Sequence, residues 1–240
     1  MNEEQYRSLC GACDHVLLAP DSTIERVAIP WLHVIREHPV FLGDYEEVVE
    51  PSKKVKTIGR KWLRILRSNA GWCRRFGRAL ITPGRYWFGP EELQHGMDAL
   101  FVSHLINASH AGTAEDFYFG DLPNRLATLG HPAVIALINH QHKPVASLAD
   151  KWKGRPVPRL ILSGSLGILE ELALRFRLKK ESLRLSRLSK AAAPGLARHV
   201  LARASEEALS GGSHLNLRIA TQIRALAAKL KPKVIVVTHE

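Results

Sequence analysis

Nearly all-apolar runs alternate with longer amphipathic segments in the second half of the chain. The apolar runs predict buried strands at 98–107, 133–139, 158–163 and 233–240. Segments with helical periodicity lie at 117–130, 166–178, 191–209 and 214–230, with a basic link over 179–190. Buried strands that alternate with helices imply a parallel sheet that is covered on both faces. The pattern therefore predicts an α/β fold with a Rossmann-like parallel sheet and helices on both faces.

The first part of the chain follows a less regular pattern. Residues 24–35 could be helical on either side of their proline, and residues 53–78 form a basic amphipathic segment. Pro-Gly and Gly-Pro turn signals within 83–90 then mark a boundary. We expect a mainly helical region over 1–90 and a Rossmann-like domain over 91–240. Because the last apolar run ends at what would be the carboxyl edge of the sheet, we expect that domain to be truncated at its last strand.

The segment 53–78 carries ten basic side chains and no acidic one. On a helix, Trp62, Ile65 and Leu66 share one face because they are three and four residues apart, while basic residues occupy the other faces. This pattern suits a helix lying in the interface of an anionic membrane. A solvated helix that packs on the body through its aromatic stripe would show the same pattern, so both interpretations stay open. The residues that would contact a membrane are Lys61, Trp62, Arg64, Arg67, Trp72 and Arg75.

The chain of 240 residues has 34 Lys and Arg against 23 Asp and Glu, which gives a formal net charge of +11. This excess favours a polyanionic partner, such as a phosphate ester, an anionic lipid or nucleic acid. No nucleic-acid motif is present, so nucleic acid is not the partner we expect. The first residues lack the apolar core of a signal peptide, and no stretch approaches the roughly 20 apolar residues of a membrane span. We expect a cytoplasmic protein that can be peripheral on the inner face of the cytoplasmic membrane.

The three cysteines are Cys10, Cys13 and Cys73. An odd number without secretory context disfavours a disulfide framework and fits a reducing compartment. The Cys-x-x-Cys pair lacks two further ligands at workable spacing, so we predict no metal site.

Polar residues follow each predicted strand, where a parallel sheet binds its ligands. These residues are Ser103, His104 and Asn107; Asn139, His140 and His142; Ser163 and Ser165; and Thr238, His239 and Glu240. Helix-capping residues also occur at such places, so any one of them alone would more often be structural. The presence of polar residues after all four predicted strands favours a ligand-binding site at this edge of the sheet. His104 or Glu240 could act as a general base in a closed cleft.

The loop over 112–123 places three acidic residues among aromatic ones, namely Glu115, Asp116 and Asp121. Carboxylates accept hydrogen bonds from sugar hydroxyls, and aromatic faces offer apolar platforms, so the loop could face a carbohydrate. Alternatively, an acidic residue caps the following helix and the phenylalanines belong to the core.

Several nucleotide-binding and hydrolase motifs are missing from the sequence. No Gly-x-Gly-x-x-Gly follows the first strand and no P-loop motif occurs, which argues against a dinucleotide dehydrogenase and a P-loop NTPase. No Gly-x-Ser-x-Gly or His-Glu-x-x-His motif is present either. The segment Ser163-Gly-Ser-Leu-Gly167 leads from a strand into a helix, where Ser163, Ser165 and backbone N–H groups could meet a phosphate.

Four segments together resemble a known family. They are Leu100-Phe-Val-Ser-His-Leu105, Glu115-Asp-Phe-Tyr-Phe-Gly-Asp-Leu-Pro123, Leu137-Ile-Asn-His140 and Val236-Val-Thr-His-Glu240. In these segments the chain resembles bacterial surface-carbohydrate biosynthesis proteins, which are GT-B-like glycosyltransferases of O-antigen or capsule assembly. The resemblance spans residues 98–240, and its most specific element is Asp-Phe-Tyr-Phe-Gly-Asp-Leu-Pro.

The resemblance implies two Rossmann-like domains that face each other across a cleft. The first holds the acceptor and the second holds the nucleotide-sugar donor, so this chain would be the acceptor-side portion and inactive alone. By position, His104 and Glu240 are the candidates for the base. The candidates for acceptor binding are Ser103, Asn107, Asp116, Asp121, Asn139, His140 and His239. Many such enzymes use no bound metal and no cofactor besides the donor cosubstrate.

Two functions follow from these observations. The first is a glycosyltransferase that moves a sugar from a nucleotide sugar to a lipid-linked or glycan acceptor, with helix N-termini or cations stabilising the leaving phosphates. The second is a non-catalytic assembly module that docks on a membrane or another polyanion through its basic segment.

Overall fold

The computed structural model describes residues 1–34, 45, 48–49, 54–81, 84–90, 93, 96–107, 113–140, 148, 152 and 155–238, and within 54–67 it describes only some side chains. The chain forms two compact units. The helical unit comprises Met1–Ile81 and Ile168–Arg218, and the sheet unit comprises Thr82–Gly167 and Ile219–Glu240. The boundary predicted near residue 90 lies close to the first change of unit, but helices from the second half of the sequence belong to the helical unit.

Three helices build the core of the helical unit. They are α1 (Glu3–Leu17), α8 (Ile168–Ala191) and α9 (Leu196–Glu207). Helix α1 begins with a capping box, in which Asn2 and Gln5 each accept the other's backbone N–H at 2.8 Å. Leu9, Leu185 and Val200 are fully buried in one apolar cluster that joins the three helices. Burial of these side chains supplies the main driving force for this unit.

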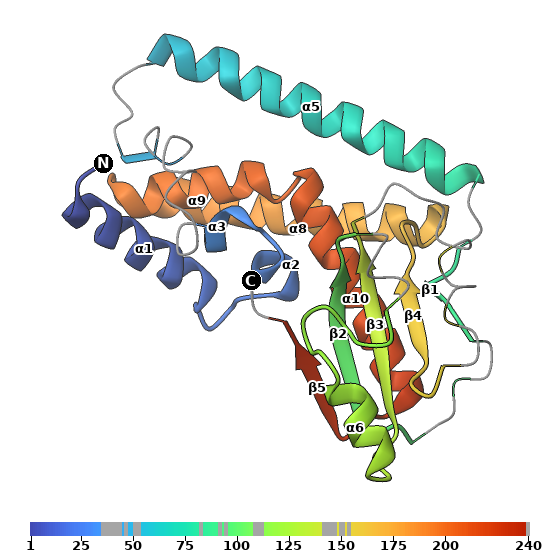
Figure 1. Cartoon of the computed structure of the whole chain (residues 1–240). Coiled ribbons are helices and arrows are strands. Elements are labelled where there is room, and N and C mark those ends of the chain that lie inside the picture. Colours follow the sequence, from blue (N-terminus) through green and yellow to red (C-terminus); the bar gives the residue numbers. More distant parts are fainter. Residues whose placement is uncertain are drawn as a thin grey trace. The chain divides into compact units, whose positions relative to one another are not determined.

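Two short helices and one long helix complete the unit. Helices α2 (Ile24–Val27) and α3 (Trp31–Val34) lie on either side of Pro30, as the sequence predicts. Helix α5 (Lys54–Ile81) confirms the single helix expected over the basic segment. Figure 1 shows it as one uninterrupted helix.

The basic link predicted over 179–190 is wrong, because α8 continues through it without a break. Leu178, Ser182, Leu185 and Ser189 are buried at intervals of three and four residues and extend one helical stripe along the segment. The many Lys and Arg residues of the segment occupy the other faces of the same helix. The buried stripe therefore overrides the polar composition that suggested a connection.

The sheet unit contains a mixed five-stranded sheet, so the α/β fold class is confirmed. Its strands are β1 (Trp87–Phe88), β2 (Ala99–Leu105), β3 (Ala133–Asn139), β4 (Arg159–Leu162) and β5 (Val234–Val237). Their order is β1-β4-β3-β2-β5. The pairs β4-β3, β3-β2 and β2-β5 are parallel, whereas β1 pairs antiparallel with β4. The sequence predicted a purely parallel sheet, and this prediction is wrong for the short edge strand β1, which is antiparallel.

Strand β1 reaches β4 because the chain approaches it closely at a glycine. Gly89 has φ +157°, and a Cβ atom at this position would lie 2.9 Å from Cβ of Leu160. Real Cβ atoms do not approach so closely, and side chains disfavour this backbone conformation. Two residues of the turn region that the sequence marked as a boundary thus form an added strand.

Helices cover both faces of the sheet, as the sequence predicts. On one face, Leu226 and Leu230 of α10 (Gly211–Leu230) pack against Leu100 and Val102 of β2. On the other face, Leu126 of α6 (Leu122–Thr128) packs with Phe101 and Ile135. Figure 1 shows α6 in front of the strands and α10 behind them. Alternate residues of each buried strand therefore enter different cores, which explains why the strands are apolar at nearly every position.

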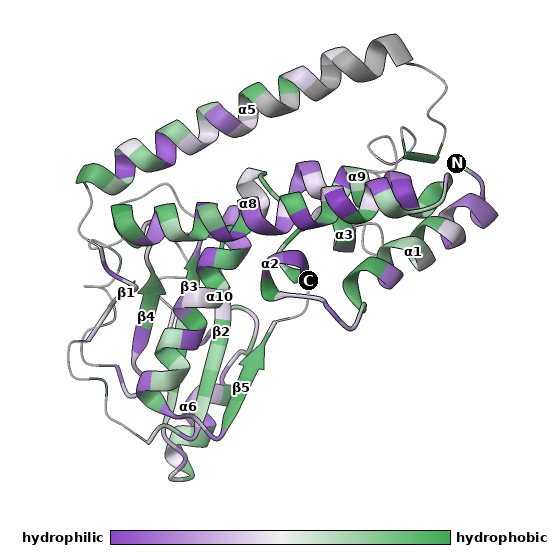
Figure 2. Ribbon diagram, turned by 180° about the vertical axis from the view of Figure 1, so that it is seen from behind, coloured by the Kyte–Doolittle hydropathy of each residue, from purple (hydrophilic) through white to green (hydrophobic). Residues whose placement is uncertain are grey.

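Strand β5 forms the other edge of the sheet. Val234, Ile235 and Val237 are exposed at 50%, 44% and 61%. Figure 2 shows this strand in the green of hydrophobic residues. Its backbone pairs with β2 from Ala99 to Val102.

Candidate functional site

Two histidines meet at the carboxyl edge of the sheet. His104 is the penultimate residue of β2, and His140 directly follows β3, where its backbone N–H donates to the Leu105 carbonyl at 3.2 Å. Nδ1 of His104 lies 2.7 Å from Nε2 of His140, and the rings stack with centroids 5.0 Å apart. His104 is half-buried and His140 is exposed. We call these two residues the histidine pair.

The hydrogen bond within the histidine pair has a chemical consequence. One of the two bonded ring nitrogens must carry a hydrogen and the other must keep its lone pair. The tautomers of the two imidazoles are therefore coupled, because a hydrogen on one of the bonded nitrogens excludes a hydrogen on the other. The ring of Tyr118 packs on His104 with centroids 5.7 Å apart. The pair is consequently held in place from the side of the following loop as well as by the two strands.

That loop is organised around the carboxylate of Asp116, which is 6% exposed. Its Oδ1 accepts hydrogen bonds from Oγ of Ser103 at 2.8 Å and from the backbone N–H groups of Tyr118 and Phe119 at 3.0 Å each. Backbone hydrogen bonds in both directions join Asp116 to Gly120. The segment 117–120 is thus a tight turn, and the helix predicted over 117–130 begins only at Leu122.

Two arginines hold the start of the same loop. Arg159 donates to the carbonyl oxygens of Thr113 at 3.2 Å and Ala114 at 2.8 Å, and Arg155 donates to the Thr113 carbonyl at 2.6 Å. Burial, and then the charge of Arg155, lower the pKa of Arg159, while the nearby charge of Asp116 opposes this shift. Arg159 is not among the site residues predicted from the sequence. A single arginine inside the apolar run 158–163 was the signal that could have identified it.

A small cavity lies beside these groups. It encloses about 10 Å³, and its lining includes His104, Glu115, Asp116, Trp152 and Arg159. This volume holds about one water molecule. The cavity is therefore too small to hold a sugar ring.

Asp121 takes the helix-capping place that one interpretation of the loop assigned to an acidic residue. It stands at the N-cap of α6, but its side chain does not cap the backbone. Instead it accepts from Asn124 at 3.0 Å and from Arg125 at 3.1 Å. These hydrogen bonds, first that of Asn124 and then that of Arg125, lower the pKa of Asp121. Its carboxylate remains partly open to solvent.

Ser163 and Ser165 form a separate, buried group. Oγ of Ser163 donates to the Ser165 carbonyl at 2.7 Å and accepts from the Ser165 N–H at 3.2 Å, and Oγ of Ser165 accepts from the Gly167 N–H at 3.3 Å. Both serines are 3% exposed. Their hydroxyls serve the turn after β4, so the geometry supplies no phosphate contact by these side chains.

The other candidates at this edge are less enclosed. Asn107 is exposed beyond β2, and Asn139 is the half-buried last residue of β3. The backbone N–H of Thr238 donates to the Val102 carbonyl at 3.3 Å, which continues the pairing of β5 with β2. His142, His239 and Glu240 lie outside the described residues.

The candidates for membrane contact on α5 divide into two groups. Trp62 is 61% exposed, together with Leu63 and Leu66. Trp72 is half-buried, stacks on Phe76 with centroids 5.0 Å apart, and lies under the guanidinium of Arg175 from α8. Arg75 is also half-buried and lines a cavity of the helical unit. The carboxyl-terminal half of α5 thus packs on α8, whereas Trp62, Leu63 and Leu66 are exposed to solvent.

The side chains of Lys61, Arg64 and Arg67 lie outside the described part of α5. None of the helices that the structure describes is both long enough and apolar enough to cross a membrane. Within the same described part of the chain, no three His, Cys, Asp or Glu side chains are grouped as ligands for a metal ion. Comparison of the chain with protein-family models, curated proteins and solved structures gave no match.

Proposed function

We propose that this protein is a GT-B-like glycosyltransferase of bacterial surface-polysaccharide biosynthesis and that the carboxyl edge of its sheet binds the sugar acceptor. The observation that carries the proposal is the histidine pair, in which His104 and His140 are joined by a hydrogen bond of 2.7 Å at the ends of neighbouring parallel strands. Ligands of open α/β sheets bind at this edge. Histidine is the side chain that most often serves as a general base.

The order of the parallel strands supports a Rossmann-like assignment. From β2 the chain moves outward to β3 and β4, and it then returns to the other side of β2 to form β5. Such a reversal leaves a crevice outside the carboxyl ends of the two strands between which the direction changes. Here those strands are β2 and β5, and β2 carries Ser103 and His104 close to its end.

The proposed reaction needs a base for the acceptor. The acceptor hydroxyl gives its proton to an imidazole nitrogen, and the oxygen then forms a bond to the anomeric carbon of the donor sugar. The bond between that carbon and the nucleoside diphosphate breaks, and the diphosphate leaves with the electron pair. One histidine of the pair takes the proton, while its partner fixes the tautomer and stabilises the imidazolium that forms.

The surrounding residues position the histidine pair and the acceptor. Asp116, held by Ser103, closes the turn that places Tyr118 against His104. Arg159 fixes the beginning of the same loop. Asp121, Asn107 and Asn139 supply carboxylate and amide groups of the kind that bind sugar hydroxyls. In this proposal His239 and Glu240 belong to the same edge by their place in the sequence after β5.

We further propose that the protein acts at the inner face of the cytoplasmic membrane on a lipid-linked or glycan acceptor. The exposed group of Trp62, Leu63 and Leu66 on the cationic helix α5 supports this location. Tryptophan and leucine side chains enter the lipid interface while basic side chains meet the headgroup phosphates. A nucleotide sugar would be the donor, bound mainly by a second domain.

The same exposed group favours a second candidate, a non-catalytic assembly module that docks on the membrane. The two functions differ in what they require of the histidine pair. A module needs the exposed face of α5 but not His104 or His140, whereas a transferase needs the pair as well.

The test replaces His104 by glutamine in the full-length protein, in cells from which the original gene has been deleted. His131→Gln serves as the control, because His131 is an exposed histidine of the same unit that pairs with Asp98 at 2.9 Å. We expect His104→Gln to abolish the surface glycan while the protein level stays normal, and the control to restore it. The purified wild type should release nucleoside diphosphate from one member of a panel of nucleotide sugars. Normal glycan with His104→Gln would support the assembly module instead.

A further inference from the structure

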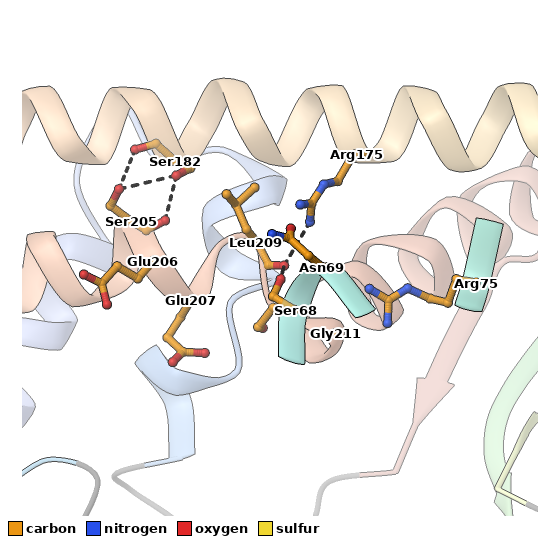
Figure 3. Close-up of a pocket in the computed structure, with 11 residues that line it drawn as sticks. Ser68, Asn69, Arg75, Arg175, Ser182, Ser205, Glu206, Glu207, Leu209 and Gly211 are labelled. Atoms are coloured by element: carbon orange, nitrogen blue, oxygen red, sulfur yellow. Dashed lines mark hydrogen bonds between the residues drawn. The ribbon is translucent and has the colours of Figure 1, made fainter. Parts of the chain in front are cut away.

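The helical unit contains a cavity of about 410 Å³ that the proposed transfer reaction does not use. Helices α5, α8 and α9 and the beginning of α10 line it, and Figure 3 shows the side chains. Arg75 and Arg175 stand toward one end in that view, whereas Glu206 and Glu207 stand toward the other. Pockets for small molecules commonly have volumes of about 300–1,000 Å³. The cavity is thus large enough for a small organic ligand.

Arg75 provides the main evidence that the ligand is an anion. Its Nε and Nη2 atoms are buried without any hydrogen-bond partner among the described residues. Its Nη1 lies against the start of α10, where a Cβ atom at Gly211 would be 3.1 Å away. A buried guanidinium that lacks hydrogen-bond acceptors is costly, and such groups in native proteins have a partner. An anionic ligand in the cavity would supply the missing acceptors.

The charges around Arg75 do not balance. Burial, and then the charges of Arg218 and Arg175, lower the pKa of Arg75, while Glu171 opposes the shift. Glu171 is itself engaged by His214 and lies 3.6 Å from Nη1 of Arg218. Arg75 is thus influenced by two further arginines and by one carboxylate, Glu171, that already has partners. Two other carboxylates, Glu206 and Glu207, line the cavity toward its opposite end, and Glu207 pairs with Arg203 at 2.9 Å.

The contacts of Arg175 place its guanidinium where it can also bind an anionic ligand. Its Nη1 donates to the Leu209 carbonyl at 3.0 Å, and its guanidinium lies over the ring of Trp72 with 5.8 Å to the centroid. These contacts fix the side chain on the cavity wall, and no acidic side chain among the described residues forms an ion pair with it. Two arginines from different helices toward one end of the cavity can donate several N–H groups to one phosphate.

We propose that this cavity binds a small phosphorylated molecule, with its phosphate between Arg75 and Arg175 and its organic part against Leu209. The hydroxyls of Ser182 and Ser205 close the far wall by donating to each other's carbonyls at 2.7 and 2.8 Å. A duplex nucleic acid or a bilayer could not enter a space of about 410 Å³. The site therefore fits a soluble phosphate ester or a single headgroup phosphate.

The test measures the binding of inorganic pyrophosphate to the full chain by titration calorimetry, for the wild type, Arg75→Gln and Arg74→Gln. Arg74 is the neighbouring arginine on α5 and is exposed, so it is the matched control. We expect saturable binding at one site that weakens at least about tenfold in Arg75→Gln and changes less than about twofold in Arg74→Gln. Absence of saturable binding by the wild type, or an equal loss in both variants, would overturn the proposal.

Competition by lipid vesicles and thermal unfolding are measured in addition to pyrophosphate binding. Vesicles that contain an anionic phospholipid are tested for competition with pyrophosphate, and competition that requires Arg75 would identify a headgroup as the source of the phosphate. Vesicle binding that requires Arg75 without any binding of pyrophosphate contradicts a phosphate cavity. Thermal unfolding shows whether each protein is folded. Pyrophosphate should also raise the Tm of the wild type above its value in sodium chloride of equal ionic strength, because it binds the folded state. No difference between the two salts would also count against the site.

Discussion

Nδ1 of His104 and Nε2 of His140 lie 2.7 Å apart, although 36 positions separate the two residues in the sequence. The parallel register of β2 and β3 brings them together, because Leu105 pairs with Asn139 and places the next residue beside the end of β2. Both histidines are separate candidates in the sequence, and their hydrogen bond could not be predicted from it. Their direct contact turns two possible bases into one unit.

Replacing Asp116 by alanine tests the turn that supports this unit. The substitution removes the acceptor of three hydrogen bonds, from Ser103 and from two backbone N–H groups, at a site that is 6% exposed. We expect the free energy of unfolding to fall by about 2–3 kcal/mol, since buried donors lose their partner. Denaturant unfolding of the purified variant measures this value.

The matched control is Asp121→Ala, five positions further along. Its carboxylate accepts from Asn124 and Arg125 at the surface, where solvent screens the contacts, so the loss of unfolding free energy should be much smaller than for Asp116→Ala. Equal losses for the two variants would show that the Asp116 turn is not the anchor of the loop.

A buried ion pair in the helical unit leads to a second stability prediction. Arg26 is 1% exposed, and its Nε donates to Oε1 of Glu181 at 2.6 Å. Arg26→Ala leaves the buried Glu181 carboxylate without this partner, and we expect a loss of about 3–5 kcal/mol. Arg7→Ala is the control, because the pair of Arg7 with Glu3 is exposed, and we expect less than about 0.5 kcal/mol. Similar values for both would contradict the structural role of the pair. Chemical denaturation gives both numbers.

The ionisation of Asp21 should contribute to the pH dependence of the unfolding free energy. The hydrogen bond from Arg26, and also the charges of Arg26 and Arg184, lower the pKa of Asp21 below its usual value of 3.8. A depressed pKa in the folded state means that the unfolded state binds the proton more tightly, so stability rises with pH in this range. The contribution is therefore complete above pH 3.8 and is lost as the pH falls through the lower pKa of the folded state.

Asp21→Asn should accordingly flatten the fall of the unfolding free energy between about pH 5 and pH 2. Unfolding curves in a series of buffers at constant ionic strength provide the comparison. Parallel pH profiles for the variant and the wild type would mean that Asp21 does not contribute in this way.

The uncompensated charge of Arg75 predicts opposite effects on stability and on binding. Without a ligand, Arg75→Gln removes a half-buried cation whose buried Nε and Nη2 atoms have no hydrogen-bond partner among the described residues. We expect the free energy of unfolding to rise by about 1 kcal/mol, because an unsatisfied buried group is costly. In the same variant, the increase in Tm caused by pyrophosphate should disappear. A clear loss of stability in the absence of ligand would show that Arg75 is satisfied by the protein itself.

The sequence predicted the main strands of the sheet well, since a buried strand needs apolar residues on both faces. The runs 98–107 and 133–139 correspond to β2 and β3 with only small changes of boundary. The antiparallel strand β1 was missed because it has two residues and depends on a close contact at Gly89, which leaves no periodic pattern. The basic link was misjudged because residues 179–190 contain five Lys and Arg residues, and only one of their four buried residues, Leu185, is apolar.

The candidate sites were only partly predictable for a different reason. Strand ends can be read from the sequence, so His104 and His140 were identified. Hydrogen bonds formed by side chains cannot be read from the sequence in the same way. Ser163 and Ser165 were therefore assigned to phosphate binding, although their hydroxyls stabilise a turn. Arg75 was named as a membrane contact, and its place on the lining of a cavity could not be predicted because the charge pattern of α5 does not reveal which arginines lie against other helices.

The most direct test of the central proposal is a double-mutant cycle on kcat/KM for sugar transfer, measured with the proposed donor domain present, for His104→Gln, His140→Gln and the two combined. If the histidine pair acts as one base, each single change should lower kcat/KM by about 10²–10⁴-fold, and the double variant should be hardly slower than the slower single variant. His131→Gln should remain within about twofold of the wild type, since it lies outside the proposed site. Transfer at the wild-type rate after either single change, or losses that simply multiply in the double variant, would contradict the account.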